Sequence, residues 1–115
     1  MSEETSLDIA HAAMEAAPND DAARLRFYER LADNELFLLL TKEADGDQIN
    51  PEIFDLGDAS FVLVFDRIER LAQFVGKLAP YAALSGRVIA QMLAGQGIGL
   101  GVNLEVATSQ MLIPP

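Results

Sequence analysis

The chain contains no cysteine, one histidine and few basic residues. The absence of cysteine excludes disulfide bonds, thiolate zinc sites and cysteine nucleophiles, and nothing favours an oxidising compartment. His11 alone cannot build a zinc site, and no G-x-S-x-G pattern surrounds Ser60 or Ser85 to mark a serine nucleophile. We therefore expect no catalytic residue, no metal site and no cofactor, with an uncharacterised enzyme as the less favoured alternative.

Long apolar runs are also missing. Near the N-terminus the longest purely apolar run, Leu36 to Leu40, is far shorter than the ~20 residues that a membrane span needs. The first residues, Met1 to Glu4, are acidic where a secretory signal would be basic. We expect a cytoplasmic protein that does not enter a membrane.

Basic residues are outnumbered by acidic ones, 8 to 18, which gives a net charge of −10. Up to Asp58 there are 15 acidic and 4 basic residues, and from Ala59 onward 3 acidic and 4 basic, so the acidity belongs to the first half. A field of this sign repels nucleic-acid phosphates and anionic lipid. The charge therefore indicates either solubility alone or a basic partner protein.

The first part of the chain predicts a helical hairpin. Apolar residues recur at helical spacing from Leu7 to Ala17, behind a cap at Thr5 or Ser6, and Pro18 interrupts the pattern. Residues 1–18 thus form an accessory N-terminal helix. A second amphipathic helix follows from about Asp20 to Asp33, and the pair must pack on another element, for which a sheet is the obvious candidate.

Two strands are predicted in the middle of the chain. Glu35 to Leu40 is too short and too apolar for a surface helix, so we expect a strand covered on both faces. Phe61 to Phe65 combines aromatic and β-branched residues and predicts a second strand. Between them, residues 41–58 predict a ragged arm or acidic loop with a turn at 45–47. These carboxylates do not match a calcium loop, because Ile49 and Asn50 stand where Asp or Asn and then glycine are needed.

The rest of the chain alternates helices and strands. Asp66 is the expected cap of a helix that buries Ile68 and Leu71, leaves Arg70 more exposed and ends at Gly76. After it we predict an extended segment at 80–84 that begins at Pro80 and suits a strand start or an edge, a helix at 86–94 capped by Ser85, a strand at 98–102, a turn near 105–109 and a last strand at 111–113.

Glycine alternates with apolar residues in the strand at 98–102. Gly97, Gly99 and Gly101 leave one face of this strand without side chains. Leu100 occupies the third glycine position of a dinucleotide loop and a helix precedes the strand, so nucleotide binding by this route is excluded. Either another element approaches the bare face closely, or the face lines a groove for a partner peptide or small ligand.

Polar residues cluster where the predicted strands meet helices. If these strands run side by side in parallel, their ends converge at the sheet edge where open α/β folds bind ligands. The candidate ligand or partner surface comprises Asp66, Arg67, Arg70, Tyr81, Arg87, Gly97, Gly99, Gly101 and Asn103. The alternative is structural: Asp66 caps a helix, Arg70 and Arg87 are solvated, and Asn103 adopts a left-handed turn.

The order of these motifs resembles the N-terminal domain of the SseB family, from about Asp20 to Pro115. The motifs are Phe27-Tyr28, Glu35-Leu36-Phe37, Phe65-Asp66, Glu69-Arg70-Leu71, Pro80-Tyr81, Ser85-Gly86-Arg87, Gly99-Leu100-Gly101-Val102-Asn103 and Leu112-Ile113-Pro114-Pro115. The resemblance implies a small bacterial α/β domain whose family is associated with enhanced sensitivity to serine, and it supplies no catalytic residues. Related chains often have Asn-Pro-Gly at 103–105 and continue into a second domain, whereas this chain has Asn103-Leu104-Glu105 and is expected to be a lone domain or an excised one.

We therefore expect a single α+β domain spanning residues 1–115, in which helices pack a mixed sheet of about five strands, with an α/β fold as the alternative. The expected function is non-catalytic protein binding or regulation through a sheet edge or groove. A sensor of amino acids or other metabolites is the second hypothesis, and self-association through exposed apolar surface is the third.

Overall fold

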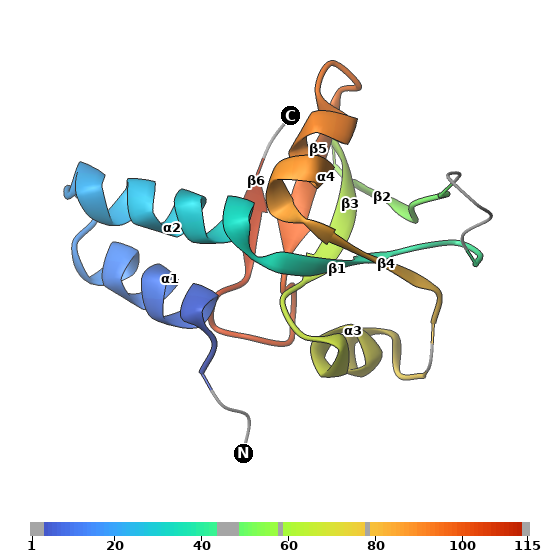
Figure 1. Cartoon of the computed structure of the whole chain (residues 1–115), viewed down its shortest axis with the longest axis horizontal. Helices are drawn as coiled ribbons and strands as arrows, with labels where there is room; N and C mark the ends of the chain where they lie inside the picture. Colours follow the sequence, from blue (N-terminus) through green and yellow to red (C-terminus); the bar gives the residue numbers. More distant parts are fainter. Residues whose placement is uncertain (1–3, 44–48, 58, 78, 114–115) are drawn as a thin grey trace.

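The computed structural model describes residues 4–43, 49–57, 59–77 and 79–113, and every structural statement below refers to these. They form four helices and one mixed six-stranded sheet (Figure 1). The elements in chain order are α1 (Ser6–Ala16), α2 (Asp21–Asp33), β1 (Glu35–Leu39), β2 (Ile53–Leu56), β3 (Ala59–Phe65), α3 (Ile68–Val75), β4 (Tyr81–Ser85), α4 (Gly86–Leu93), β5 (Ile98–Val102) and β6 (Met111–Ile113). The α+β expectation is confirmed, with one strand more than predicted.

The sheet has the order β4-β1-β3-β5-β6, and β2 pairs with the first half of β3. β3 and β5 are parallel neighbours, whereas β1 is antiparallel to both β3 and β4. β4 therefore runs in the same direction as β3 but is separated from it by β1. The additional strand is β2, which lies in the segment 41–58 where we expected a ragged arm or loop; the turn predicted at 45–47 and Asp58 fall outside the described residues.

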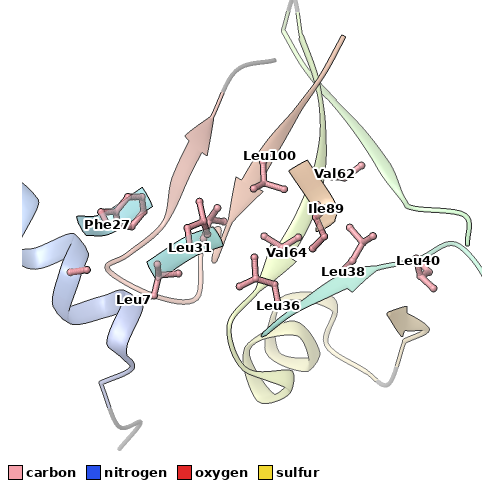
Figure 2. Packing of buried hydrophobic residues seen from close by; sticks show 12 residues of the cluster. Leu7, Phe27, Leu31, Leu36, Leu38, Leu40, Val62, Val64, Ile89 and Leu100 are labelled. Atoms are coloured by element: carbon pink, nitrogen blue, oxygen red, sulfur yellow. The ribbon is translucent and has the colours of Figure 1, made fainter. Parts of the chain in front are cut away.

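The two faces of the sheet carry separate apolar cores. On one face, Leu36, Leu38 and Val64 pack with Leu7 of α1, Phe27 and Leu31 of α2, and Ile89 of α4 (Figure 2). On the other face, the alternate residues of the same strands, Leu39, Leu63 and Phe65, pack with Leu71 of α3. Two-sided burial explains why the central strands read as continuous apolar runs.

The N-terminal helical hairpin is present as expected. Thr5 caps α1 in a capping box with Asp8, and Asp20 caps α2 through the backbone N–H of Ala22. α1 packs on α2, and together with α4 they cover one face of the sheet, while α3 lies on the opposite face (Figure 1).

The start of α3 differs from the prediction. Its N-cap is Arg67 rather than Asp66, and no side chain caps it. Arg70 is buried, at 6% exposure, whereas Ile68 is 37% exposed, so the polar and apolar assignments of these two positions were reversed. The reason is that Asp66 and Arg70 are used for long-range contacts, which a helical wheel does not contain. The helix end at Gly76 and the Ser85 cap of α4 are confirmed.

Candidate functional site

The ends of β3 and β5 converge, as the polar-edge hypothesis requires. The two strands are parallel neighbours, so Asp66 and Asn103, each the first residue after its strand, lie side by side. The side chain of Asn103 accepts a hydrogen bond from the backbone N–H of Asp66 at 3.1 Å. Asn103 is fully buried and has a φ of 49°, the left-handed conformation predicted for it, which asparagine tolerates better than most residues.

This junction is completed by an ion pair from the N-terminal helix. Arg70 of α3 donates to both carboxylate oxygens of Asp8 in α1, at 3.0 and 2.6 Å, and to Asp66 at 2.9 Å. Asp66 also accepts from the hydroxyl of Thr5. Ser109, which precedes β6, donates to Asp8 at 2.6 Å and accepts from the side-chain amide of Asn103 at 3.0 Å. We call Thr5, Asp8, Asp66, Arg70, Asn103 and Ser109 the buried polar cluster.

The electrostatics of the cluster stabilise the charged forms. Burial raises the pKa of Asp8, but hydrogen bonds from Arg70, Ser109 and the backbone of Thr5 outweigh it and hold that pKa well below its usual range. The hydrogen bond to Asp8 raises the pKa of Arg70. Each carboxylate accepts from its neighbours, and the guanidinium is divided between two carboxylates, so these groups are engaged with one another. The cluster therefore has the properties of a structural element that connects α1, α3 and the segment before β6.

Other residues of the predicted surface lie elsewhere. Arg87 is on α4, exposed, and pairs with Asp33 at 2.6 Å. Tyr81 is at the opposite end of β4 from Arg87 and stacks edge-on against Phe37, with ring centroids 5.6 Å apart. The prediction that all these side chains converge on one edge is wrong, because β1 separates β4 from β3 and because Tyr81 begins its strand instead of ending it.

Arg67 lines a polar hollow of about 520 Å³ between the start of α1, the α2–β1 junction and the start of α3, and Thr5 and Asp66 of the buried polar cluster line it too. Its other charged lining residues are acidic, including Glu4, Glu35 and Glu69.

Within the described residues, no group of three or more acidic or histidine side chains is arranged to hold a metal ion. No helix in the same part of the chain is long and apolar enough to cross a membrane.

The bare face is covered from within the chain at Gly99 and Gly101, whereas a Cβ at Gly97 would meet no atom within 4 Å. A Cβ at Gly99 would come within 2.5 Å of the carbonyl oxygen of Ile113 in β6 and 2.7 Å of the ring of Phe61, and one at Gly101 within 2.7 Å of Leu63 and 3.0 Å of Leu104. The register pairs Phe61 with Gly99 and Leu63 with Gly101, so large side chains of β3 lie over the glycines of its neighbour. Close approach by a neighbouring strand therefore accounts for Gly99 and Gly101.

A hollow of apolar character, a groove of about 510 Å³, lies between α2 and α4. Its walls are the helices, and its floor is formed by Ile98 and Leu100 of β5 with Ile113 of β6. Among the described residues, no charged side chain lines it. The lining residues are Tyr28, Leu31, Ala32, Gly86, Ala90, Leu93, Ala94, Gly95, Gly97, Ile98, Gly99, Leu100 and Ile113. Two of the predicted glycines, Gly97 and Gly99, thus lie in the groove that we call the helix groove.

The shape of the helix groove follows from one close contact. Gly86 begins α4 directly against α2, and a Cβ built there would be 1.9 Å from the carbonyl oxygen of Leu31. The two helices meet at this point. Tyr28, about one turn back along α2, and Ala90, about one turn forward along α4, both line the groove, so the groove opens on this side of the contact, above the sheet.

Sequence reasoning missed the distant members of both sites. Asp8 and Ser109 are 101 positions apart, and only the fold brings them together. The available signal was Asp8 itself, an acid at the third position of a helix beside the buried Leu7. For the helix groove the signal was Gly86, Ala90 and Ala94, small residues four apart on one flank of a helix.

One family model, described as the SseB protein N-terminal domain, matches residues 10–115. Neither a curated protein nor a solved structure matches the chain. The match extends the resemblance found from the motifs by about one helix toward the N-terminus and includes four members of the buried polar cluster, from Asp66 to Ser109. It also includes every residue that lines the helix groove. The chain therefore belongs to the SseB family, of which it carries the N-terminal domain.

Proposed function

We propose that this domain is a non-catalytic protein-binding module of the cytoplasm, and that the helix groove holds apolar side chains of its partner. The observation that carries the proposal is the groove itself: about 510 Å³ of open volume whose described lining residues include no charged side chain. Burying one leucine-sized side chain there is worth about 1.5–3 kcal/mol. The groove thus offers binding energy without offering acid, base or nucleophile.

The surface outside the groove supports a partner larger than a metabolite. Tyr28 is 37% exposed on the groove wall, and Leu25, one turn earlier on the same stripe of α2, is 60% exposed. Exposed apolar side chains that continue a groove mark interaction surfaces, and tyrosine is enriched in them because its ring is apolar and its hydroxyl remains hydrated. A partner segment could cover Leu25 and Tyr28 while inserting a side chain between the helices.

Charge and composition support the remaining parts of the proposal. Asp8, Asp66 and Arg70 are paired with one another, which favours a structural role for these buried charges over catalysis. The net charge of −10 favours a protein partner over nucleic acid or an anionic membrane, and the absence of cysteine favours the cytoplasm.

The test fills the groove. Ala90→Phe places an aromatic ring between α4 and Tyr28, and Ala12→Phe adds the same ring at an exposed position of α1 that does not line the groove. Each immobilised variant would be used to capture proteins from a bacterial lysate, and binding of each purified candidate would then be measured by calorimetry. We expect Ala90→Phe to weaken binding at least ~10-fold, equivalent to ~1.4 kcal/mol, and Ala12→Phe to leave it unchanged.

Thermal unfolding of both variants serves as the folding control, because the side chain of Ala90 is exposed in the open groove. A partner that binds Ala90→Phe as tightly as the natural chain would rule out the groove. Failure of the natural chain to enrich any protein over Ala90→Phe would count against the protein-binding function.

A small apolar metabolite is the second candidate occupant, because the groove volume lies within the range of about 300–1,000 Å³ typical of ligand pockets. A thermal-shift screen with amino acids and related metabolites tests it, since a ligand at 100 times its dissociation constant adds ~2.7 kcal/mol of stability. A shift that Ala90→Phe abolishes and Ala12→Phe retains would favour the metabolite. No shift with any compound would leave the protein partner as the occupant.

A further inference from the structure

The outer strand β4 presents unpaired backbone at one edge of the sheet. β4 pairs with β1 on one side and has no strand on the other among the described residues. Two hydrogen bonds at the ends of this ladder show which residues of β4 bond to β1: Leu40 N–H donates to Pro80 C=O at 3.0 Å, and Gly86 N–H donates to Asn34 C=O at 3.1 Å.

The positions of these two bonds determine which residues of β4 direct their backbone N–H and C=O groups away from β1. In an antiparallel ladder, residues that exchange hydrogen bonds alternate with residues that do not. The bonded positions at Pro80 and Gly86 therefore imply that Ala82 and Leu84 bond to β1, while Tyr81 and Ala83 direct their N–H and C=O groups away from it. Leu39, the partner of Tyr81 in the register, accordingly uses its C=O for Glu52 on its other side, at 3.0 Å.

The β4 edge also lacks the usual protection against strand pairing. Natural edge strands carry charged side chains, internal proline or bulges that prevent another strand from adding to them. The segment Tyr81–Ser85 has no charged residue and no proline, and its register with β1 is continuous. Tyr81 is 40% exposed, and Ala83 is exposed as well. An edge of this kind can bind an extended segment, whose own backbone N–H and C=O groups pair with those of β4.

We propose that a second copy of this chain pairs with the edge, β4 against β4 in antiparallel orientation about a two-fold axis at Ala82. This register opposes Tyr81 of each copy to Ala83 of the other. The two pairs use the outward N–H and C=O groups of both copies and form about four hydrogen bonds. The sheet then continues across the dimer.

Self-complementarity is the reason to choose a second copy. In this register a large ring lies beside a methyl group in both pairs, because Tyr81 and Ala83 share one face of β4. The nearest described charge beyond the strand, Arg87, is already paired with Asp33, so the approach of the other copy brings no unpaired cation to the strand end.

Helix α4 adds apolar surface on the other face of the sheet, the face that carries Ala82 and Leu84 of β4. Val88 and Met92 are 42% and 37% exposed and lie one turn apart, on the flank opposite Ala90 and the helix groove. The helix groove, with α2 as its second wall and β5 and β6 as its floor, lies on the Ala90 flank of α4. The free flank therefore faces the β4 side of the sheet, where the added strand would lie. An incoming β4 would present Ala82 and Leu84 to this side.

Sedimentation velocity and amide hydrogen exchange test the proposal on the whole chain. From about 10 μM to about 1 mM, the weight-average mass should rise toward that of a dimer. Exchange at Tyr81 and Ala83 should slow with concentration, while exchange at Leu84, which the β1 ladder already protects, should not change. Association should strengthen with added salt, because screening reduces repulsion between two chains of charge −10.

Two substitutions at one position make the test specific. Ala83→Pro removes an outward N–H without removing a bond to β1, and should weaken dimerisation at least ~10-fold while the monomer stays folded. Ala83→Val keeps the N–H and should retain the dimer. A chain that stays monomeric throughout, or a dimer that Ala83→Pro does not weaken, overturns the proposal. Ala90→Phe in the helix groove should not affect dimerisation, so this outcome is independent of the proposed function.

Discussion

Asp8 and Arg70 are 62 positions apart in the chain, yet they form a two-bond ion pair in which each residue is 6% exposed. Asp8 lies in the first turn of α1, and Arg70 lies in α3 on the opposite face of the sheet. The pair therefore joins the two helical layers around the end of the sheet. Asp8 precedes the residues matched by the family model, which begin at position 10, whereas Arg70 lies within them.

Removing the carboxylate of Asp8 should strongly destabilise the fold. In Asp8→Asn, Arg70 keeps Asp66 but loses its second carboxylate in a buried site, and breaking a buried pair typically costs about 3–5 kcal/mol. Urea unfolding would measure the loss. The matched control is Asp21→Asn, which breaks an exposed pair with Arg24 at 3.2 Å and should cost less than about 0.5 kcal/mol. Equal losses in the two variants would refute the structural role of Asp8.

The same pair predicts how stability depends on pH. Hydrogen bonds from Arg70 and Ser109 hold the folded-state pKa of Asp8 below its ordinary value of 3.8. In acid the unfolded chain then binds the proton more readily than the folded chain, so the contribution of Asp8 is complete above pH 3.8 and declines as the pH falls below it. The difference in unfolding free energy between the natural chain and Asp8→Asn should therefore be constant from about pH 7 to about pH 5 and smaller at about pH 3. A difference that is constant or grows in acid would contradict this assignment.

Much of the fold could be predicted from the sequence because its signals are local. Thr5, Asp20 and Ser85 cap helices through groups within a few positions of themselves, and two-sided burial makes β1 and β3 continuous apolar runs. The partial failure at the segment 41–58 has a physical reason as well. β2 forms there because β3 offers it a ladder, whereas its own signal is only four residues long and is interrupted by Asp55, a residue depleted in strands.

The candidate sites were less predictable because they depend on strand order. Asp66 and Asn103 were placed together correctly, since β3 and β5 proved to be parallel neighbours. Arg87 was placed with them wrongly because β1, an earlier strand, inserts between β3 and β4. The helix groove depends on the crossing of α2 and α4, and no periodicity within either helix determines that crossing.

Gly86 should be irreplaceable at the point where α2 and α4 meet. In Gly86→Ala the new Cβ would lie 1.9 Å from the Leu31 carbonyl oxygen, so the helices must separate, at a cost of about 1–3 kcal/mol or more. Gly95→Ala is the informative comparison, because Gly95 has open space but a φ of 77°, which should cost only about 1 kcal/mol. Thermal unfolding measures both costs, and binding to the helix groove should change more in Gly86→Ala. A larger loss in Gly95→Ala would show that backbone strain outweighs the helix contact.

Asn103 combines two roles that a pair of variants can separate. Its φ of 49° favours residues that tolerate the left-handed region, and its side chain bonds both the backbone of Asp66 and the hydroxyl of Ser109. Asn103→Gly keeps the backbone conformation and loses both side-chain bonds, leaving buried groups unsatisfied at about 1–3 kcal/mol. Asn103→Ala loses the same bonds and adds about 1 kcal/mol of left-handed strain. Urea unfolding should therefore rank the natural chain above Asn103→Gly and Asn103→Gly above Asn103→Ala. If alanine proves as stable as glycine, the turn is not strained, and the hydrogen bonds alone account for the choice of asparagine.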